Sequence, residues 1–507
     1  MADAIDEETG HSTRGETVED PLVIVANRGP VSYSRSEGER VAERGKGGLV
    51  TALAGLVGQF KDALWVCAAL SDEDVAVTRE HDGQAFDLEA NGGPGIRLRM
   101  LELDRDAQHK FYGVISNPLL WFVQHYLWEL SEAPNITRFE WDAFDAGYAP
   151  VNAQFADAVA EEVEGFGGRS TVMVHDYHFY LVPQRVRARC PEAFLYHFVH
   201  IPWPHPDAWR VLPPPMREAL FHGVLGNDVV AFHNQRSARN FLLGCAELIG
   251  TPIDLPEHTV TVGDRTVAVR WHPISVNPDE LEAGAESPRV ADYERRLREE
   301  RREHLALRVD RADLSKNVLR GFRAFDVMLD DHPELAERVT FLALLQRTRE
   351  DVDEYVEYME KIRALVEEIN RKHGTDSWQP IELDLEGDFD RVLAAYKLFD
   401  VLMVNAVFDG MNLVAKESVL LNENDGVLAL SENTGAYEEL GKYAVTLHPF
   451  DIQQQADGLF EALMMDREER RERLKACAAI VRENDIGKWL EEQLEDVRQL
   501  SGRKSAS

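Results

Sequence analysis

The segment Phe408–Glu417, with the sequence FDGMNLVAKE, places an Asp, an Asn, a Lys and a Glu where an amphipathic helix pattern begins. The apolar run VLMVNAV comes directly before it and is typical of a short buried strand. A capped turn would explain these polar residues without any function. A ligand bound at the helix N-terminus would also explain them, because the free N–H groups and the dipole of a helix attract anions there.

Other polar clusters also stand immediately after predicted strands. They are Asn27–Pro30, Gly45–Gly48, His175–His178, His200–Pro206, Arg308–Asn317, Gln346–Asp351 and Ser431–Ala436. Ordinary surface turns would be divided between the two ends of a sheet, whereas nearly all of these clusters follow the carboxyl ends of strands. Doubly wound sheets bind their ligands at that edge. The joint placement therefore favours a binding cleft over a set of unrelated turns.

Taken singly, the clusters allow structural explanations. GKGG at 45–48 matches neither the GxxxxGK[ST] phosphate loop nor the GxGxxG dinucleotide motif, so alone it indicates a turn. HDYH has two His three residues apart, but no third ligand at an informative spacing, and we expect no metal site. In RVDRADLSKN, Arg311 and Lys316 either belong to a solvated helix start with Ser315 as its N-cap, or face an anion beside that helix.

Two stretches of alternating strand and helix patterns would position these clusters. Predicted strands of the first are PLVIVA, LWVCAAL, TVMV and AFLYHFVH, and those of the second are LALRVDR, VTFLALL, VLMVNAV, VLAL and AVTLHP. In the second stretch, helices are expected at NVLRGFRAFDVML and over the charged segment 350–372. Apolar strands that alternate with helices predict parallel sheets covered on both faces. We therefore expect an α/β protein with two doubly wound, Rossmann-like domains facing across a cleft.

Composition shifts set the expected domain boundaries. Residues 1–20 are polar and acidic, and both they and the final SGRKSAS are typical of disorder. We expect the first domain over 21–285, ending in a hairpin at 263–264 and a connector with two prolines. The second domain is expected over 286–484. A C-terminal helix within 485–507 is expected to pack back on the first domain.

The composition excludes several classes of protein. A net charge of -35 without a basic stripe argues against nucleic-acid binding. No apolar run reaches membrane-spanning length and no signal-peptide core is present, so we expect a cytoplasmic protein without a membrane partner. Its cysteines show no paired spacing, which indicates buried free thiols in a reducing compartment; they are Cys67, Cys190, Cys245 and Cys477.

Taken in order, the motifs ANRGP, GKGGL, YGVISNPLLW, HDYH, HIPWP, DRADLSK, TRED and DGMNLVAKE resemble those of the trehalose-6-phosphate synthase family, over about residues 21–500. The resemblance implies the GT-B architecture of retaining glycosyltransferases. It also implies transfer of glucose from UDP- or GDP-glucose to glucose-6-phosphate, giving trehalose-6-phosphate, with no metal or other cofactor. The expected chemistry is attack by the acceptor on the face that the diphosphate leaves.

The resemblance also implies roles for individual residues. Catalytic roles fall on Asp176 and His200 at the reacting sugars and on Arg311 and Lys316 at the donor diphosphate. The implied acceptor contacts are Arg28, Tyr112, Trp121 and Arg349. The implied donor contacts are Gly47, Gly48, Asp409, Met411, Asn412, Leu413, Val414 and Glu417. Within that set, Asp409 would meet the sugar hydroxyls and Glu417 the ribose.

Three departures from the family pattern leave alternatives open. Phe408 stands where an Arg is common, Cys67–Ala68 replace Gly-Trp, and RADLSKN replaces RLDYSKG. Two of them are shared with actinobacterial members and with the validoxylamine-phosphate synthases, which couple pseudo-sugars. A pseudo-glycosyltransferase and a non-catalytic sugar-phosphate sensor are therefore the alternatives. The donor base, uracil or guanine, and whether the protein forms a homo-oligomer also stay open.

Overall fold

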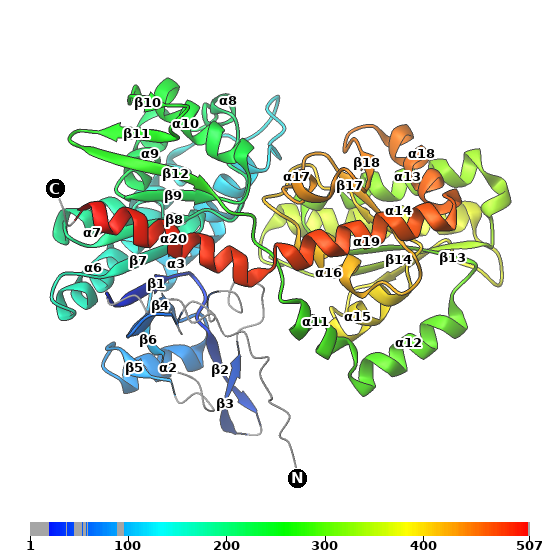
Figure 1. The fold of residues 1–507 in the computed structure, drawn as a ribbon, viewed down its shortest axis with the longest axis horizontal. Helices are drawn as coiled ribbons and strands as arrows, with labels where there is room; N and C mark the ends of the chain where they lie inside the picture. Colours follow the sequence, from blue (N-terminus) through cyan, green and yellow to red (C-terminus); the bar gives the residue numbers. More distant parts are fainter. Residues whose placement is uncertain are drawn as a thin grey trace, which may run out of the picture.

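The computed structural model of the protein describes residues 20–36, 38–44, 53, 57, 59–88 and 96–504, and its strands form two large sheets (Figure 1). The first sheet has the order β10-β11-β12-β9-β8-β7-β1-β4-β6-β5. Its strands are β1 (Leu22–Val25), β4 (Ala63–Ala68), β5 (Phe86–Asp87), β6 (Arg97–Leu101), β7 (Thr171–His175), β8 (Phe194–Phe198), β9 (Val229–Phe232), β10 (Ile253–Asp254), β11 (Thr259–Val262) and β12 (Arg265–Trp271). The second sheet has the order β15-β14-β13-β16-β17-β18. Its strands are β13 (His304–Arg311), β14 (Val339–Gln346), β15 (Ile381–Asp384), β16 (Val401–Val404), β17 (Val427–Ser431) and β18 (Val445–Leu447). A separate hairpin pairs β2 (Val31–Ser36) with β3 (Glu39–Arg44).

Helices connect the strands and cover both sheets (Figure 1). Those around the first sheet are α2 (Asp72–Glu80), α3 (Arg105–Gln108), α4 (Trp121–Gln124), α5 (Arg138–Ala143), α6 (Ala149–Gly165), α7 (Val182–Arg189), α8 (Pro206–Trp209), α9 (Pro214–Val224) and α10 (Gln235–Ile249). The later helices are α11 (Pro278–Ala285), α12 (Pro288–Glu300), α13 (Val318–Asp331), α14 (Asp353–His373), α15 (Phe389–Leu398), α16 (Leu413–Leu421), α17 (Tyr437–Leu440), α18 (Ile452–Met464), α19 (Arg467–Glu483) and α20 (Ile486–Lys504). The 3₁₀ or π segments in the described part of the chain are η1 (His109–Leu120), η2 (Phe144–Tyr148), η3 (Tyr177–Phe179), η4 (Leu314–Lys316) and η5 (Pro333–Leu335).

Each sheet is parallel where the candidate site lies, and each contains one reversal of strand order. In the first sheet the chain proceeds outward from β1 through β4 to β6, and outward in the other direction from β7 to β12. The second sheet reverses in the same way between β13 and β16. Such switch points open a crevice at the carboxyl ends of the strands. The predicted α/β class is confirmed, with the central strands of both sheets parallel and with antiparallel pairs of β5, β10 and β11 only at the edges of the first sheet.

The apolar strands are buried on both faces, because successive side chains point to opposite sides of a sheet. In β1, Val23 and Val25 belong to the hydrophobic core on one face. Leu22 and Ile24 belong to a second core, which continues into residues of the second sheet such as Leu305. This two-sided burial explains why these strands are continuous apolar runs rather than alternating ones.

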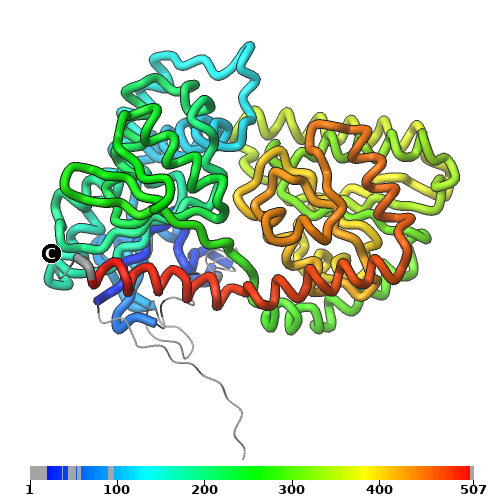
Figure 2. Tube along the Cα trace, turned by 45° about the horizontal axis from the view of Figure 1, so that its top comes forward, coloured from blue at the N-terminus to red at the C-terminus, as the bar shows by residue number. Residues whose placement is uncertain are grey.

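The C-terminal helix α20, red in Figures 1 and 2, returns from the second domain to the first. Its side chains Trp489, Leu494 and Val497 are each 1% exposed. His272, directly after β12, lies 2.7 Å from the Asp496 carboxylate through its Nε2. Although burial lowers the pKa of His272, hydrogen bonds to acidic side chains of α20 outweigh burial and raise it.

The sequence predicts disorder at both chain ends, and the structure describes part of the C-terminal end. Disorder of the final SGRKSAS is wrong for residues 501–504, because α20 continues to Lys504. Leu500 packs against the core that spans both domains, which anchors these last turns. Residues 1–19 and 505–507 lie outside the described residues.

Among the described residues, no helix combines the length and the apolar character that crossing a membrane would require. The four cysteines are free and buried, as predicted.

Candidate active site

The predicted site residues gather where the two switch points lie. Asp176 follows β7 and His200 follows β8 in the first sheet, while Arg311 ends β13 and Asp409 follows β16 in the second. Contacts between these loops join the two domains, for example between Gly410 and the backbone of His200. The grouping of polar residues at carboxyl strand ends, which the sequence predicted, is therefore present in both sheets.

Lys316 and Asp409 form an ion pair between the ends of β13 and β16. The Asp409 carboxylate also accepts a hydrogen bond of 3.1 Å from the Asn412 side chain. Burial raises the pKa of Asp409, but the Lys316 ammonium outweighs it and lowers the pKa, so the carboxylate is ionised. Both side chains are largely buried, at 13% and 14% exposure. A ligand that enters here meets a cation and an anion whose charges already balance.

The DGMN turn is in contact with the first domain through its glycine. A Cβ on Gly410 would lie 2.2 Å from the carbonyl oxygen of His200, so only glycine fits at this close approach. The Gly410 carbonyl accepts a hydrogen bond of 3.1 Å from the Asn234 side chain, also of the first domain. Asn412 then caps α16, because its side-chain oxygen accepts from the Ala415 N–H at 3.1 Å. The turn thus fixes the N-terminus of α16 against the loop after β8.

The guanidinium groups of two arginines lie near the Trp121 ring. Arg349 lies 4.0 Å from the ring centroid and Arg311 lies 5.6 Å from it. Aromatic faces stabilise such cations electrostatically. Trp121 comes from the first domain and both arginines from the second, so the arrangement places positive charge at the seam between the domains.

Asp313 is a central residue of the site that the sequence did not single out. Its carboxylate is fully buried and accepts from Arg349 Nη1 at 2.7 Å and from the Trp121 indole at 3.3 Å. Burial raises its pKa, but Arg349 and Arg311 outweigh burial and hold the pKa far below its ordinary value. Its position inside DRADLSK, between two cations, was the available signal.

The predicted N-cap role of Ser315 is wrong. Asp313, two residues earlier, takes the capping role, since it accepts from the Ser315 N–H at 2.9 Å and from the Ser315 hydroxyl at 2.8 Å. Residues 314–316 form the 3₁₀ turn η4, and Asn317 follows with a left-handed φ of 59°. Helix α13 begins only at Val318. Lys316 therefore ends a 3₁₀ turn and does not lie in the first turn of α13.

Three of the expected acceptor residues lie near His178, the second histidine of the HDYH motif. Tyr112 stacks on His178 with ring centroids 5.8 Å apart. Burial, together with the positive charges of Arg349 and Arg28, lowers the pKa of His178 to about 3. Arg28 and Arg349, from different domains, are thus both close enough to His178 to act on its charge. Arg28 is exposed, which leaves its guanidinium accessible to a ligand.

Asp176 and His200 are connected at the end of β7 and β8. The His200 N–H donates to Asp176 Oδ1 at 3.2 Å. Burial raises the pKa of Asp176 to about 7, against smaller lowering contributions from backbone hydrogen bonds and from the site arginines. The His200 pKa lies well below its ordinary value because of burial and neighbouring histidines, so its imidazole is neutral.

Residues of α16 occupy the remaining donor positions. Glu417 is half-buried, and desolvation of its carboxylate raises its pKa; the carboxylate accepts from the Tyr396 hydroxyl at 3.1 Å. Met411 is buried, while Leu413 and Val414 in the first turn are half-buried. Gly47 and Gly48, also expected to meet the donor, lie outside the described residues.

Two departures from the family pattern have structural consequences. Phe408 packs on Tyr126 of the first domain with ring centroids 4.5 Å apart, so an aromatic contact between domains stands where a charge is common. Cys67 is buried in β4, and its Sγ lies 2.8 Å from where a Cβ of Gly29 would be. Cys67 thus packs directly beneath the loop that carries Arg28.

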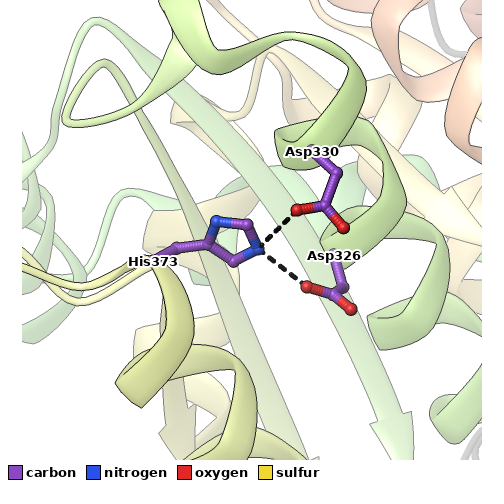
Figure 3. Close-up of side chains that lie close together, drawn as sticks. All are labelled: Asp326, Asp330 and His373. Carbon is purple, nitrogen blue, oxygen red and sulfur yellow. Dashed lines mark hydrogen bonds and ion pairs between the residues drawn. The ribbon is translucent and has the colours of Figure 1, made fainter.

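One candidate metal cluster occurs in the part of the chain that the structure describes, and it lies away from this site. Asp326 and Asp330 on α13 face His373 on α14 (Figure 3). The Lys372 ammonium already lies between the two carboxylates, 2.8 Å from Asp326 and 2.5 Å from Asp330. A lysine that neutralises the acidic pair is an ordinary surface arrangement and gives no sign of a cation.

The chain matches the sequence model of glycosyltransferase family 20 over residues 20–499. It is 32% identical over 498 residues to the trehalose-6-phosphate synthase of Mycolicibacterium smegmatis, with 95% of this chain and 93% of the relative covered. It is 29% identical over 489 residues to the UDP-forming alpha,alpha-trehalose-phosphate synthase A of Dictyostelium discoideum. That match covers 96% of this chain but spans only 62% of the length of the relative.

Solved structures give the same likeness in three dimensions. An Escherichia coli protein bound with UDP-2-fluoro glucose matches with a TM-score of 0.81 and 25% identity, over 94% of this chain and 99% of that one. A UDP-forming alpha,alpha-trehalose-phosphate synthase from Burkholderia xenovorans in complex with glucose-6-phosphate matches with a TM-score of 0.77 and 26% identity, over 94% and 100%. The predicted GT-B architecture, with two Rossmann-like domains, is confirmed.

Proposed function

Because this chain belongs to glycosyltransferase family 20, we propose that it transfers glucose, with retention, from a nucleotide diphosphate glucose to glucose-6-phosphate and so forms trehalose-6-phosphate. Three of the four proteins named above are UDP-forming or bound to a UDP sugar, which favours UDP-glucose as the donor. GDP-glucose is the second donor to be tested.

The observation that carries this proposal is the set of three cations at the seam between the domains. Arg311 and Arg349 lie near the Trp121 ring, and Lys316 lies beside Asp409 at the start of α16. When an anomeric C–O bond breaks, negative charge grows on the departing diphosphate. Side-chain cations and the N–H groups of a helix N-terminus, fixed in advance, stabilise that charge at little reorganisation cost.

On the sugar side, the proposal assigns Asp409 and the α16 N-terminus to the glucosyl group and Glu417 to the ribose. The Asp409 carboxylate is ionised and can accept from sugar hydroxyls. Arg28, Tyr112 and Arg349 would hold the phosphate of the acceptor. Attack would occur on the face that the diphosphate leaves, with the acceptor proton passing to the departing phosphate oxygen.

Asp176 would assist by orienting the acceptor. With a pKa of about 7 it exists in both protonation states near neutral pH, so it can donate to or accept from a hydroxyl. In this mechanism side chains supply the positive charge, so we predict that the reaction is independent of metal.

A thermal-shift panel with UDP-glucose, GDP-glucose, ADP-glucose, a nucleotide-activated cyclitol and glucose-6-phosphate tests the proposal. A ligand that binds only the folded protein raises its melting temperature by an amount set by its affinity. We expect shifts with one nucleotide sugar and with glucose-6-phosphate. Shifts with glucose-6-phosphate alone would favour a sensor. A nucleotide-activated cyclitol that shifts the protein when nucleotide glucoses do not would favour a pseudo-glycosyltransferase.

A further inference from the structure

Four histidines from three neighbouring strands surround Asp176. His175 ends β7, His197 lies in β8, and His200 and His233 follow β8 and β9. His175, His197 and His233 are at most 4% exposed. Burial lowers the pKa of each, to about 3 for His175 and His233 and about 4 for His197, so all three are neutral. A neutral imidazole has one donor and one acceptor nitrogen, which makes its hydrogen bonds directional.

Asp176 has a backbone conformation that non-glycine residues rarely adopt, with φ 74° and ψ 176°. Such a conformation persists only when surrounding contacts enforce it, and it clusters at functional sites. Its N–H donates to the Phe198 carbonyl at 2.8 Å. Its carbonyl is 3.0 Å from His197 Nε2. Because a carbonyl can only accept, His197 must carry its proton on Nε2.

The carboxyl group of Asp176 is fixed by His200, whose own ring is held from both sides. His200 donates its N–H to Asp176 Oδ1 at 3.2 Å. Its Nε2 lies 3.1 Å from His175 Nδ1, and its Nδ1 lies 3.2 Å from His233 Nε2. Both ring nitrogens of His200 therefore lie within hydrogen-bond distance of a neighbouring imidazole, which fixes the position of its ring and of its backbone N–H.

We propose that His175, His197 and His233 are positioning residues for the transfer reaction. His197 enforces the strained backbone of Asp176, and His175 and His233 hold His200 so that its N–H orients the Asp176 carboxylate. The inference rests on the proposed function in that Asp176 faces the reacting sugars. It extends the site by three residues that touch neither substrate.

Packing alone does not account for this cluster. In the described part of the chain, His175 Nε2 and His197 Nδ1 are buried and have no hydrogen-bond partner. A buried polar atom without a partner destabilises the fold, and an apolar side chain of similar size would avoid that cost. The nitrogens of His175 and His197 that do bond lead to His200 and Asp176, whereas His233 also bonds through Nδ1 to the backbone of His272 and Ile274, both at 3.4 Å. The chain thus keeps the imidazoles where a hydrophobic residue would be the more stable choice.

Paired substitutions separate positioning from packing. A Gln side chain places an amide nitrogen near the position of a His Nε2, so His197→Gln and His233→Gln can keep the bonds to Asp176 and His200. His197→Leu and His233→Leu cannot. We expect the Leu variants to lower kcat about tenfold or more, with donor KM within about threefold of the parent. The Gln variants should recover most of that loss. Equal kcat in the Leu and Gln variants, or no change in either, would overturn the proposal.

A double-mutant cycle with Asp176→Asn shows whether the effect passes through Asp176, because residues that act as a unit give non-additive losses. His197→Leu should lower kcat far less in the Asp176→Asn background than in the parent. Full additivity would mean that His197 acts through general stability.

A second cycle needs no turnover and so distinguishes failure of this inference from failure of the proposed function. Glycine tolerates positive φ, so Asp176→Gly removes the strain that His197 opposes. His197→Leu should then lower the urea midpoint less in the Asp176→Gly background than in the parent. Equal shifts in both backgrounds would refute the positioning role, whatever reaction the parent catalyses. A parent that fails to transfer glucose would refute the proposed function alone.

Discussion

Replacing Arg349 by Met should cost stability as well as acceptor binding. Arg349 and Asp313 form an ion pair of 2.7 Å whose side chains are 6% and 0% exposed. Removing one partner of a buried pair leaves an uncompensated charge and typically costs about 3–5 kcal/mol. Asp313 keeps other donors, from Trp121, Ser315 and Tyr355. We therefore expect a loss at the lower end, about 3 kcal/mol in the free energy of unfolding at pH 8.

The loss of unfolding free energy caused by Arg349→Met should decrease as the pH falls. In the parent, the pKa of Asp313 is depressed, so its stabilising contribution is fully present above the unfolded value, about 3.9, and is lost only at lower pH. Without Arg349, only Arg311 and the remaining hydrogen bonds oppose burial, so the pKa of Asp313 should rise and protonation should neutralise the carboxyl more readily. The destabilisation should therefore be smaller at pH 5 than at pH 8. Urea unfolding followed by tryptophan fluorescence at both pH values measures it.

The double variant Arg349→Met/Asp313→Asn is the matched control. Its amide is uncharged, so much of the lost stability should return, while the acceptor KM stays high because the phosphate contact is still absent. A single variant within about 1 kcal/mol of the parent at pH 8 would refute the reasoning on the buried pair. A double variant less stable than the single one would do so as well. A normal acceptor KM in both would remove Arg349 from the acceptor site.

Three further predictions concern the leaving group, metal and Asp176. Lys316→Ala should lower kcat by about 10²–10³ at saturating donor, as loss of one preorganised charge does; steady-state kinetics with kcat within a few-fold of the parent would place Lys316 outside the reaction. Activity should persist in excess EDTA, since side chains supply the charge at the diphosphate; loss of turnover that a divalent ion restores would show a metal requirement. Asp176 has a folded pKa of about 7 against an ordinary value near 3.9, so its burial lowers the free energy of unfolding progressively as pH rises from about 4 to 7. Asp176→Asn should therefore gain stability relative to the parent between pH 5 and pH 8 in urea unfolding, and a constant difference would contradict the raised pKa.

The strands and their polar ends could be predicted from the sequence because both signals are local. An apolar run such as VLMV and the DGMN that follows it lie within a few residues of each other. Close approaches between the two domains could be inferred from the sequence only indirectly, from the position of a glycine. The glycine at 410 is required because the His200 carbonyl, far away in the sequence, leaves no room for a side chain.

Long-range pairing explains what the sequence did not reveal. Asp313 owes its role to Trp121 and Arg349, and nothing near it in the chain indicates those partners. The predicted cap at Ser315 was wrong because Asp313, two residues earlier, is the stronger acceptor and captures its N–H. The histidine cluster could not be predicted either, because its members lie in or after three different strands and meet only in the folded protein.

Product analysis tests the central claim most directly. The purified protein is incubated with UDP-glucose and glucose-6-phosphate, with GDP-glucose in parallel, and the products are followed by proton NMR at the anomeric positions. We predict a disaccharide phosphate whose two anomeric protons both show the small coupling of α linkages, formed in step with release of the nucleoside diphosphate. A folded protein that binds both substrates but forms no disaccharide, or that forms a β linkage, would contradict the account.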